Sequence, residues 1–213
     1  TPLDLEHPKT FSEKTQWLKL YGHLDEQRDL VDKYKVRDWI REKVGEEYLI
    51  PLLGVWDSFD EIDFDKLPDR FVLKTNHGAG WNYIVQDKSK LDKADAKAKF
   101  DLWTKLNFTY YQGGLELQYE HIQPKIIAEQ FIENDGGDLY DYKLCCFDGE
   151  PKVIIYIMNR YVDADERIIC FDTDWNVLPF NLFTPLEQPD DIPRPKNLEK
   201  MVEVARTLSK GVP

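Results

Sequence analysis

A glycine-containing loop between two short apolar segments is the feature that most limits the fold of this chain. Residues 71–74 and 81–85 are rich in β-branched and aromatic residues, which predicts two strands. The loop between them contains the run His77-Gly78-Ala79-Gly80. No Gly-Lys-Ser/Thr and no helix follows these glycines, which excludes a P-loop and a dinucleotide-binding fingerprint. The pattern predicts a hairpin whose loop either folds over a phosphate group or is an ordinary turn.

Lys74 ends the first of these two strands and is the charged residue in an otherwise apolar segment. Strand alternation places it on the same side as Val72. An ammonium group in such a partly covered position needs an anionic partner. A bound phosphate is one such partner, and a nearby carboxylate is the structural alternative.

The chain as a whole predicts an α+β fold, because helices flank a strand-rich middle. Thr10 and Glu13 form a capping box before the first helix. A second helix is expected over residues 30–44, with Lys33, Arg37 and Arg41 along one face, which is either a solvated surface or a binding surface. The remaining expected elements are strands at 49–56, 71–74, 81–85, 126–132, 139–147, 151–158 and 167–171, and helices at 92–106 and 198–209.

Composition excludes several classes of protein. The 213 residues include 28 Lys and Arg against 40 Asp and Glu, a net charge of −12, which argues against a general nucleic-acid binder. No apolar run approaches the roughly 18 residues that span a bilayer, and no signal peptide is recognisable. Three cysteines at a spacing that fits no zinc site favour free thiols and a cytoplasmic location. The first residue, Thr1, indicates the boundary of a fragment.

Two carboxylates flank Phe131 where the segment 126–132 ends, namely Glu129 and Glu133. A carboxylate at the end of a buried strand can accept a hydrogen bond from a ribose hydroxyl or an adenine amino group. The backbone around Phe131 can meet the edge of an adenine. The alternative for Glu129 is a strand-end carboxylate at a sheet edge.

Asp141 and Lys143 are two residues apart in the next strand, so their side chains leave the same face. They form either a local ion pair worth under about 1 kcal/mol or a site for ribose, metal and phosphate, which Arg160 can join. The Asp148-Gly149 dipeptide predicts a hairpin after this strand. We expect this hairpin in the same sheet as residues 126–132, so that Asp141 and Lys143 face a cleft bordered by Lys74.

Five segments carry a family resemblance: Pro8-Lys9-Thr10-Phe11-Ser12-Glu13-Lys14, Gln16-Trp17-Leu18-Lys19, Phe71-Val72-Leu73-Lys74-Thr75-Asn76-His77-Gly78-Ala79-Gly80-Trp81-Asn82, Ala128-Glu129-Gln130-Phe131 and Asp141-Tyr142-Lys143. In their residues and in their order along the chain, these segments resemble the TupA-like family of the ATP-grasp superfamily. The resemblance implies two α+β subdomains around a nucleotide cleft. The family is associated with bacterial teichuronopeptide, capsule and other cell-surface polysaccharide synthesis, and many of its members are labelled glycosyltransferase-like.

The resemblance also implies roles for individual residues. Lys33 and Lys74 would hold the ATP phosphates, and Gly78 to Gly80 would form the phosphate flap, with Asn76 and His77 beside it. Glu129 to Phe131 would form the adenine hinge. Asp141 and Lys143 would lie near the ribose and phosphates, and Lys143 and Arg160 are the candidate catalytic residues.

The resemblance further implies a division into three parts. These are an N-terminal helical segment (1–66), a glycine-flap subdomain (67–124) and a C-terminal subdomain (125–213). Family members take Mg²⁺ from strands that follow the stretch resembling residues 198–211, and the chain stops at Pro213. We therefore expect that the strands carrying the metal ligands are missing and that this chain contains no metal ligand. We also expect no ATP turnover by the 213 residues alone. Carboxylates in later loops are assigned to turns, namely Asp163, Asp165, Asp172 and Asp174.

The expected function is that of an ATP-dependent, carboxylate-activating ligase in cell-surface polysaccharide biosynthesis. Its cofactors would be ATP and, in the full-length enzyme, Mg²⁺. Its second substrate would be a polysaccharide-linked or amino-acid-like acceptor. Two alternatives stay open: a glycosyl- or phosphoryl-transfer enzyme that uses a nucleotide sugar, and a non-catalytic nucleotide-binding module. The acceptor, the polymer and the oligomeric state do not follow from the sequence.

Overall fold

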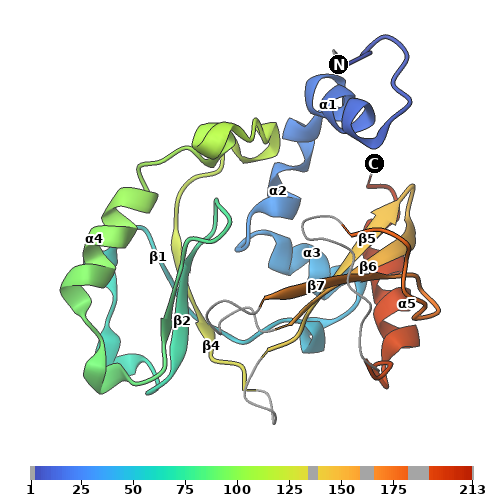
Figure 1. The fold of residues 1–213 in the computed structure, drawn as a ribbon. Coiled ribbons are helices and arrows are strands. Elements are labelled where there is room, and N and C mark those ends of the chain that lie inside the picture. The colour runs from blue at the N-terminus through green and yellow to red at the C-terminus, as the bar shows by residue number, and fades with distance from the viewer. Residues whose placement is uncertain (1–2, 134–138, 159–165, 182–191, 213) are drawn as a thin grey trace. The chain divides into compact units, whose positions relative to one another are not determined.

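The computed structural model describes residues 3–133, 139–158, 166–181 and 192–212. The chain forms two compact units, Thr1–Phe131 and Ile132–Pro213 (Figure 1). The first contains a four-stranded sheet and the second a three-stranded sheet, and all strand pairs in both are antiparallel. Together with the helices, these sheets confirm the α+β class. In the described part of the chain, no helix is long and apolar enough to cross a bilayer.

The sheet of the first unit has the strand order β1-β4-β2-β3. Its strands are β1 (Leu52–Trp56), β2 (Phe71–Thr75), β3 (Asn82–Val85) and β4 (Ile126–Gln130). The helices of this unit are α1 (Phe11–Tyr21), α2 (Arg28–Val31), α3 (Val36–Lys43) and α4 (Lys93–Trp103). Short 3-10 turns join them: η1 (Leu24–Gln27), η2 (Glu46–Tyr48), η3 (Phe59–Glu61), η4 (Phe64–Lys66), η5 (Lys88–Lys90), η6 (Phe108–Gly113) and η7 (Leu117–Tyr119). Strand β4, the last of these four strands in the sequence, is therefore central in the sheet.

The capping box at the start of α1 forms as predicted. The Thr10 hydroxyl accepts from the Glu13 N–H, and the Glu13 carboxylate accepts from the N–H groups of Thr10, Lys9 and Asp4. These hydrogen bonds favour the ionised carboxylate, the bond from the Thr10 backbone most of all, and lower the pKa of Glu13 from 4.5 to about 2.

The lowered pKa gives Glu13 a defined pH dependence. A carboxylate with a depressed pKa in the folded state stabilises that state above its unfolded pKa, and this contribution is lost as the pH falls through the folded pKa. We expect Glu13→Gln to reduce stability above pH 4.5, with a difference from the wild type that shrinks between pH 4.5 and about 2. Urea unfolding at several pH values measures this difference. A difference that stayed constant over that interval would contradict the assignment.

The continuous helix expected over residues 30–44 is wrong, because the chain leaves the helical conformation at Asp32. Asp32 has an extended ψ of 109°, and its carboxylate accepts from the N–H groups of Tyr34 and Lys35 at 2.9 and 3.2 Å. This side chain competes with helical hydrogen bonding and restarts the helix as α3. The expected cationic face is therefore also wrong: Lys33 precedes α3, Arg37 is buried, and Arg41 is partly exposed.

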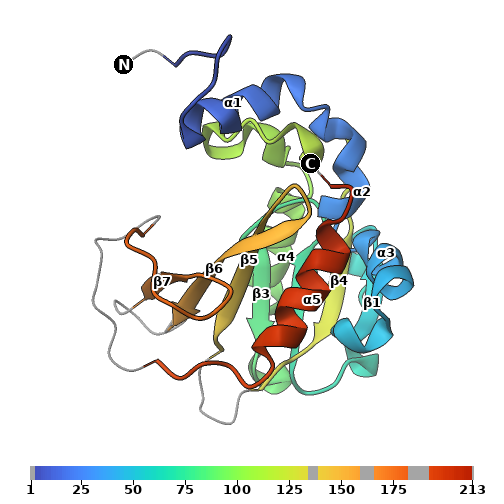
Figure 2. The same cartoon turned by 90° about the vertical axis from the view of Figure 1, so that its right-hand side faces the viewer.

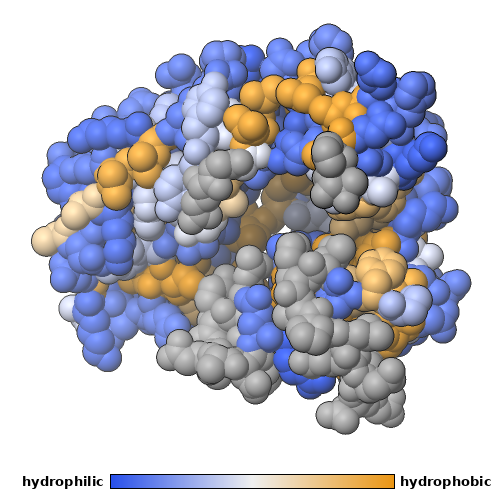
Figure 3. Space-filling view, turned by 45° about the horizontal axis from the view of Figure 1, so that its top comes forward, coloured by the Kyte–Doolittle hydropathy of each residue, from blue (hydrophilic) through white to orange (hydrophobic). Residues whose placement is uncertain are grey.

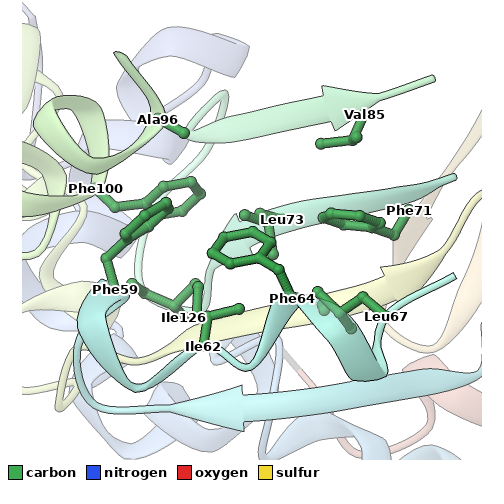
Figure 4. Packing of buried hydrophobic residues seen from close by; sticks show 11 residues of the cluster. Phe59, Ile62, Phe64, Leu67, Phe71, Leu73, Val85, Ala96, Phe100 and Ile126 are labelled. Atoms are coloured by element: carbon green, nitrogen blue, oxygen red, sulfur yellow. The ribbon is translucent and has the colours of Figure 1, made fainter. Parts of the chain in front are cut away.

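The core of the first unit covers one face of its sheet (Figure 4). Phe71 and Leu73 of β2 point into it, and Phe100 of α4 packs against Phe59 with ring centroids 5.9 Å apart. Because side chains alternate along a strand, this core directs Val72 and Lys74 to the opposite face of the sheet. The core thus determines the face on which Lys74 is presented.

The surface of the first unit retains exposed apolar side chains, and Figure 3 shows apolar patches among the polar surface. None of the residues of α1 is fully buried. Its large exposed side chains are Phe11, Trp17, Leu18, Leu20 and Tyr21. Helix α1 is therefore only partly covered by the rest of the unit.

The second unit consists of β5 (Asp141–Phe147), β6 (Glu150–Met158), β7 (Arg167–Phe171) and α5 (Leu198–Ser209), with sheet order β5-β6-β7. The β5–β6 turn has positive φ at Asp148 (52°) and Gly149 (76°), which confirms the predicted hairpin. Helix α5 lies along β5 and β6 (Figure 2) and packs Leu198 and Val202 on the sheet. Ile154 and Phe171 are buried in the same cluster.

The expectation that this hairpin shares a sheet with residues 126–132 is wrong. Strand β4 pairs with β1 on one side and with β2 on the other. Both of its edges are therefore occupied, and β5 finds its partner in β6. Two sheets result in place of one.

Candidate functional site

Lys74 and Glu129 meet on the sheet face of the first unit that lies opposite its core. Lys74 Nζ is 2.6 Å from Glu129 Oε2, across the antiparallel β2–β4 pair. The Glu129 side chain is 9% exposed and that of Lys74 is 26% exposed. Because β4 is a central strand, the interpretation of Glu129 as a carboxylate at a sheet edge is wrong. Lys74 has the nearby carboxylate partner that was the structural alternative, and its ammonium still reaches solvent.

Arg37 joins the same carboxylate from α3. Its Nη1 donates to Glu129 Oε1 at 3.2 Å, and its Nη2 donates to the carbonyl oxygen of Ile50 at 2.6 Å. The Arg37 side chain is 8% exposed. Sequence reasoning placed this residue on a helix face and missed its role. The available signal was Glu129 itself, because a carboxylate inside an apolar strand needs cationic or hydrogen-bonded partners.

Lys33 lies beside the glycine loop. Its backbone N–H donates to the carbonyl of Asn76 at 3.1 Å, and its ammonium donates to the carbonyl of Gly78. Burial, and then the positive charge of Lys74, lower the pKa of Lys33, against the opposing effect of Asp32 and Glu129. The two lysines therefore lie near enough to repel one another.

Asn76 binds three segments of the first unit together. Its side-chain N–H groups donate to Asp32 Oδ1 and to the Gln123 carbonyl, both at 3.0 Å, and its Oδ1 accepts from the Lys125 N–H at 2.6 Å. Asn76 is 1% exposed and Asp32 is 3% exposed. The amide thus fixes the segment that carries Lys33 against the loop that carries Gly78.

The glycine loop is anchored at its base and exposed at its tip. A side chain at position 78 would bring its Cβ within 2.3 Å of the Trp81 ring, and Gly80 has a φ of +74°. Trp81 is buried against Phe108 and Tyr111, whereas Ala79 and Gly80 are exposed. Within the described residues, the N–H groups from 78 to 80 have no hydrogen-bond acceptor. These groups can therefore bind an anion.

His77 anchors the loop to the C-terminal end of α4. Its Nε2 is 3.1 Å from the Trp103 carbonyl, which can only accept, so this nitrogen carries the proton. Its Nδ1 is buried and has no partner among the described residues. Burial, the largest influence, lowers the pKa of His77 and keeps the ring neutral.

The remaining candidate residues belong to other elements of the chain. Phe131 follows β4, with the Arg70 guanidinium 5.2 Å above its ring. Asp141 and the exposed Lys143 lie on β5 in the second unit. Arg160, Asp163 and Asp165 lie outside the described residues.

Asp172 is a turn carboxylate, as predicted, because it accepts from the N–H groups of Asp174 and Asn176. Among the residues that the structure describes, no group of three or more His, Cys, Asp or Glu side chains could hold a metal ion.

The charges around the glycine loop suit a phosphate ligand. Lys33, Lys74 and Arg37 face the carboxylates of Asp32 and Glu129, so positive charge is in excess. The unbonded N–H groups of the loop add hydrogen-bond donors. Elements that are far apart in the sequence thus bring together hydrogen-bond donors and three cations that face two carboxylates.

Comparison with known proteins gives one family match. The model of a family described as TupA-like ATPgrasp matches residues 13–213. No curated protein and no solved structure matches the chain. The family match spans nearly the whole sequence, and the family implies ATP binding. The chain therefore belongs to the TupA-like ATP-grasp family.

Proposed function

We propose that the chain binds the phosphates of ATP at Lys33, Lys74 and the glycine loop, as part of an ATP-dependent, carboxylate-activating ligase in cell-surface polysaccharide biosynthesis. The observation that carries the phosphate assignment is the excess of positive charge at the loop, where three cations face two carboxylates. Family membership supports ATP as the nucleotide. The polysaccharide context rests on the family resemblance.

The proposed reaction has two steps. A substrate carboxylate attacks the γ-phosphorus of ATP, the bond to the β-phosphate oxygen breaks, and ADP leaves. The nitrogen of an acceptor amine then attacks the acyl phosphate, and inorganic phosphate leaves as the amide forms. Positioning and charge neutralisation are the protein's part in such chemistry. Lys33 and Lys74 would neutralise phosphate charge, and the loop N–H groups would orient the phosphate oxygens.

The remaining residues have supporting roles in this proposal. Asn76 keeps Lys33 beside the loop, and the neutral His77 keeps the loop base in place. The segment from Glu129 to Phe131 would receive the adenine. Asp141 would act near the ribose, and Lys143 and Arg160 would be catalytic cations. Bound Mg²⁺ would supply further positive charge at the β- and γ-phosphates.

An activity assay on the full gene product tests the ligase proposal. The protein is incubated with ATP, Mg²⁺ and a panel of sugar acids and amino acids, with hydroxylamine to trap an acyl phosphate as a hydroxamate. We expect ADP and hydroxamate in equal amounts, and neither without the carboxylate. Release of AMP, or transfer of sugar from a nucleotide sugar under the same conditions, would contradict carboxylate activation through an acyl phosphate.

A further inference from the structure

One carboxylate is shared between two cations at the centre of the candidate site. Glu129 Oε2 accepts from Lys74 at 2.6 Å, and Glu129 Oε1 accepts from Arg37 at 3.2 Å. Each oxygen of the carboxylate thus serves a different positive group. The two cations differ in exposure, because the Lys74 side chain is 26% exposed and the Arg37 side chain is 8% exposed.

Arg37 is held in a way that turns it away from a ligand. One arm of its guanidinium binds Glu129, and the other binds the Ile50 carbonyl at 2.6 Å. Because both arms of this buried guanidinium are hydrogen-bonded within the protein, Arg37 can affect a ligand only through the groups that it binds. Its partner Glu129 is also the partner of Lys74, which extends toward solvent.

The charge on Glu129 determines how strongly Lys74 can attract a phosphate. A carboxylate paired with one ammonium forms a neutral pair, and such a pair attracts an anion weakly. The same carboxylate paired with an ammonium and a guanidinium leaves a net positive group. In a partly buried site, where solvent screens charges poorly, this difference is larger than at an exposed surface.

We propose that Arg37 is a positioning residue that holds Glu129 and offsets its negative charge, so that Lys74 remains available to a phosphate. The inference rests on the proposed function, because it concerns the same phosphate site. It adds Arg37 to the phosphate site as a residue that does not contact the ligand. In a purely structural role, Arg37 would link α3 to the sheet and its charge would not affect the ligand.

Inorganic tripolyphosphate is the probe that separates these two roles, because it lacks the adenine that the proposed function places at Glu129. Its affinity is measured calorimetrically for the wild type, Arg37→Met, Glu129→Gln and the double variant Arg37→Met/Glu129→Gln. Lys66→Met is the matched control, because the Lys66 side chain is 84% exposed. Circular dichroism and thermal melts establish which variants are folded.

The net charge around Lys74 predicts the order of the tripolyphosphate affinities of the variants. Arg37→Met should bind tripolyphosphate about tenfold more weakly, a loss of about 1.4 kcal/mol. The double variant restores the net charge around Lys74 and should bind within threefold of the wild type. Glu129→Gln should bind more tightly than the double variant, and Lys66→Met should match the wild type. Rescue by a second substitution is a result that a structural role for Arg37 would not produce.

Other results would count against the role of Arg37 or against the proposed function. Unchanged affinity in Arg37→Met, or a double variant as weak as Arg37→Met, would overturn the role of Arg37. If Arg37→Met does not fold, the comparison between Glu129→Gln and the double variant decides, and equal affinities would overturn the proposal. Wild-type protein that binds tripolyphosphate but no ATP would count against the proposed function, while the variant series would still test Arg37. Binding of neither probe would overturn both.

Discussion

Lys74→Ala is expected to weaken ATP binding about 100-fold while the protein stays folded. A hydrogen bond to a charged group contributes about 1.5–3 kcal/mol, and about 2.7 kcal/mol corresponds to 100-fold in affinity. Lys74 is the more exposed of the two cations that bind Glu129, and its loss also lets Glu129 repel the phosphates. The substitution should also abolish any ATP turnover.

The fold should survive this substitution because Glu129 keeps a cationic partner. Removing one member of a buried ion pair is costly when it leaves the other charge unpaired. Here Arg37 continues to bind Glu129. Lys66→Ala is the matched control, with an 84% exposed side chain and an expected affinity equal to the wild type. Calorimetric titration with ATP, together with circular dichroism, measures both results. An unfolded Lys74→Ala, or one with wild-type affinity, would contradict the account.

Asn76→Ala is expected to destabilise the first unit by about 3 kcal/mol. The substitution removes one of three hydrogen bonds to Asp32 Oδ1, together with the partners of the Gln123 carbonyl and the Lys125 N–H. A buried polar group left without its partner costs about 1–3 kcal/mol, and water that enters the space recovers part of this. For a chain of this size, the melting temperature should fall by about 10 °C.

Asn82→Ala is the control for this prediction, because Asn82 is exposed on β3 of the same sheet. It should change stability by less than about 0.5 kcal/mol. Urea unfolding of both variants gives the free energies. If both substitutions changed the free energy of unfolding by the same small amount, the hydrogen bonds of Asn76 would contribute little to stability. A large change for Asn76→Ala that left phosphate affinity per folded molecule unaltered would contradict its proposed role in placing Lys33.

Local patterns in the sequence predicted much of the fold. The capping box at Thr10 and Glu13 and the turn at Asp148 depend on neighbouring residues and were predicted correctly. The helix at 198–209 likewise follows from its own apolar spacing. Each of these features involves residues close in sequence, so its signal is contained in a short segment.

The errors arise where distant segments decide the structure. The break at Asp32 is reinforced by Asn76, 44 residues further along the chain. Arg37 is buried by Glu129, 92 residues away, and no helical periodicity contains that information. The separation of the two sheets depends on β1 taking the free edge of β4. In the candidate site, Lys74 was identifiable as a cation in an apolar strand, whereas the sharing of Glu129 required the folded chain.

Calorimetric titration of the wild-type chain with ATP, GTP and a UDP-sugar tests whether the cations and N–H groups around the glycine loop bind the phosphates of ATP. The predicted result is saturable binding of ATP at one site, more tightly than GTP or the UDP-sugar, and lost in Lys74→Ala. Tighter binding of the UDP-sugar, or ATP binding that Lys74→Ala leaves unchanged, would contradict it.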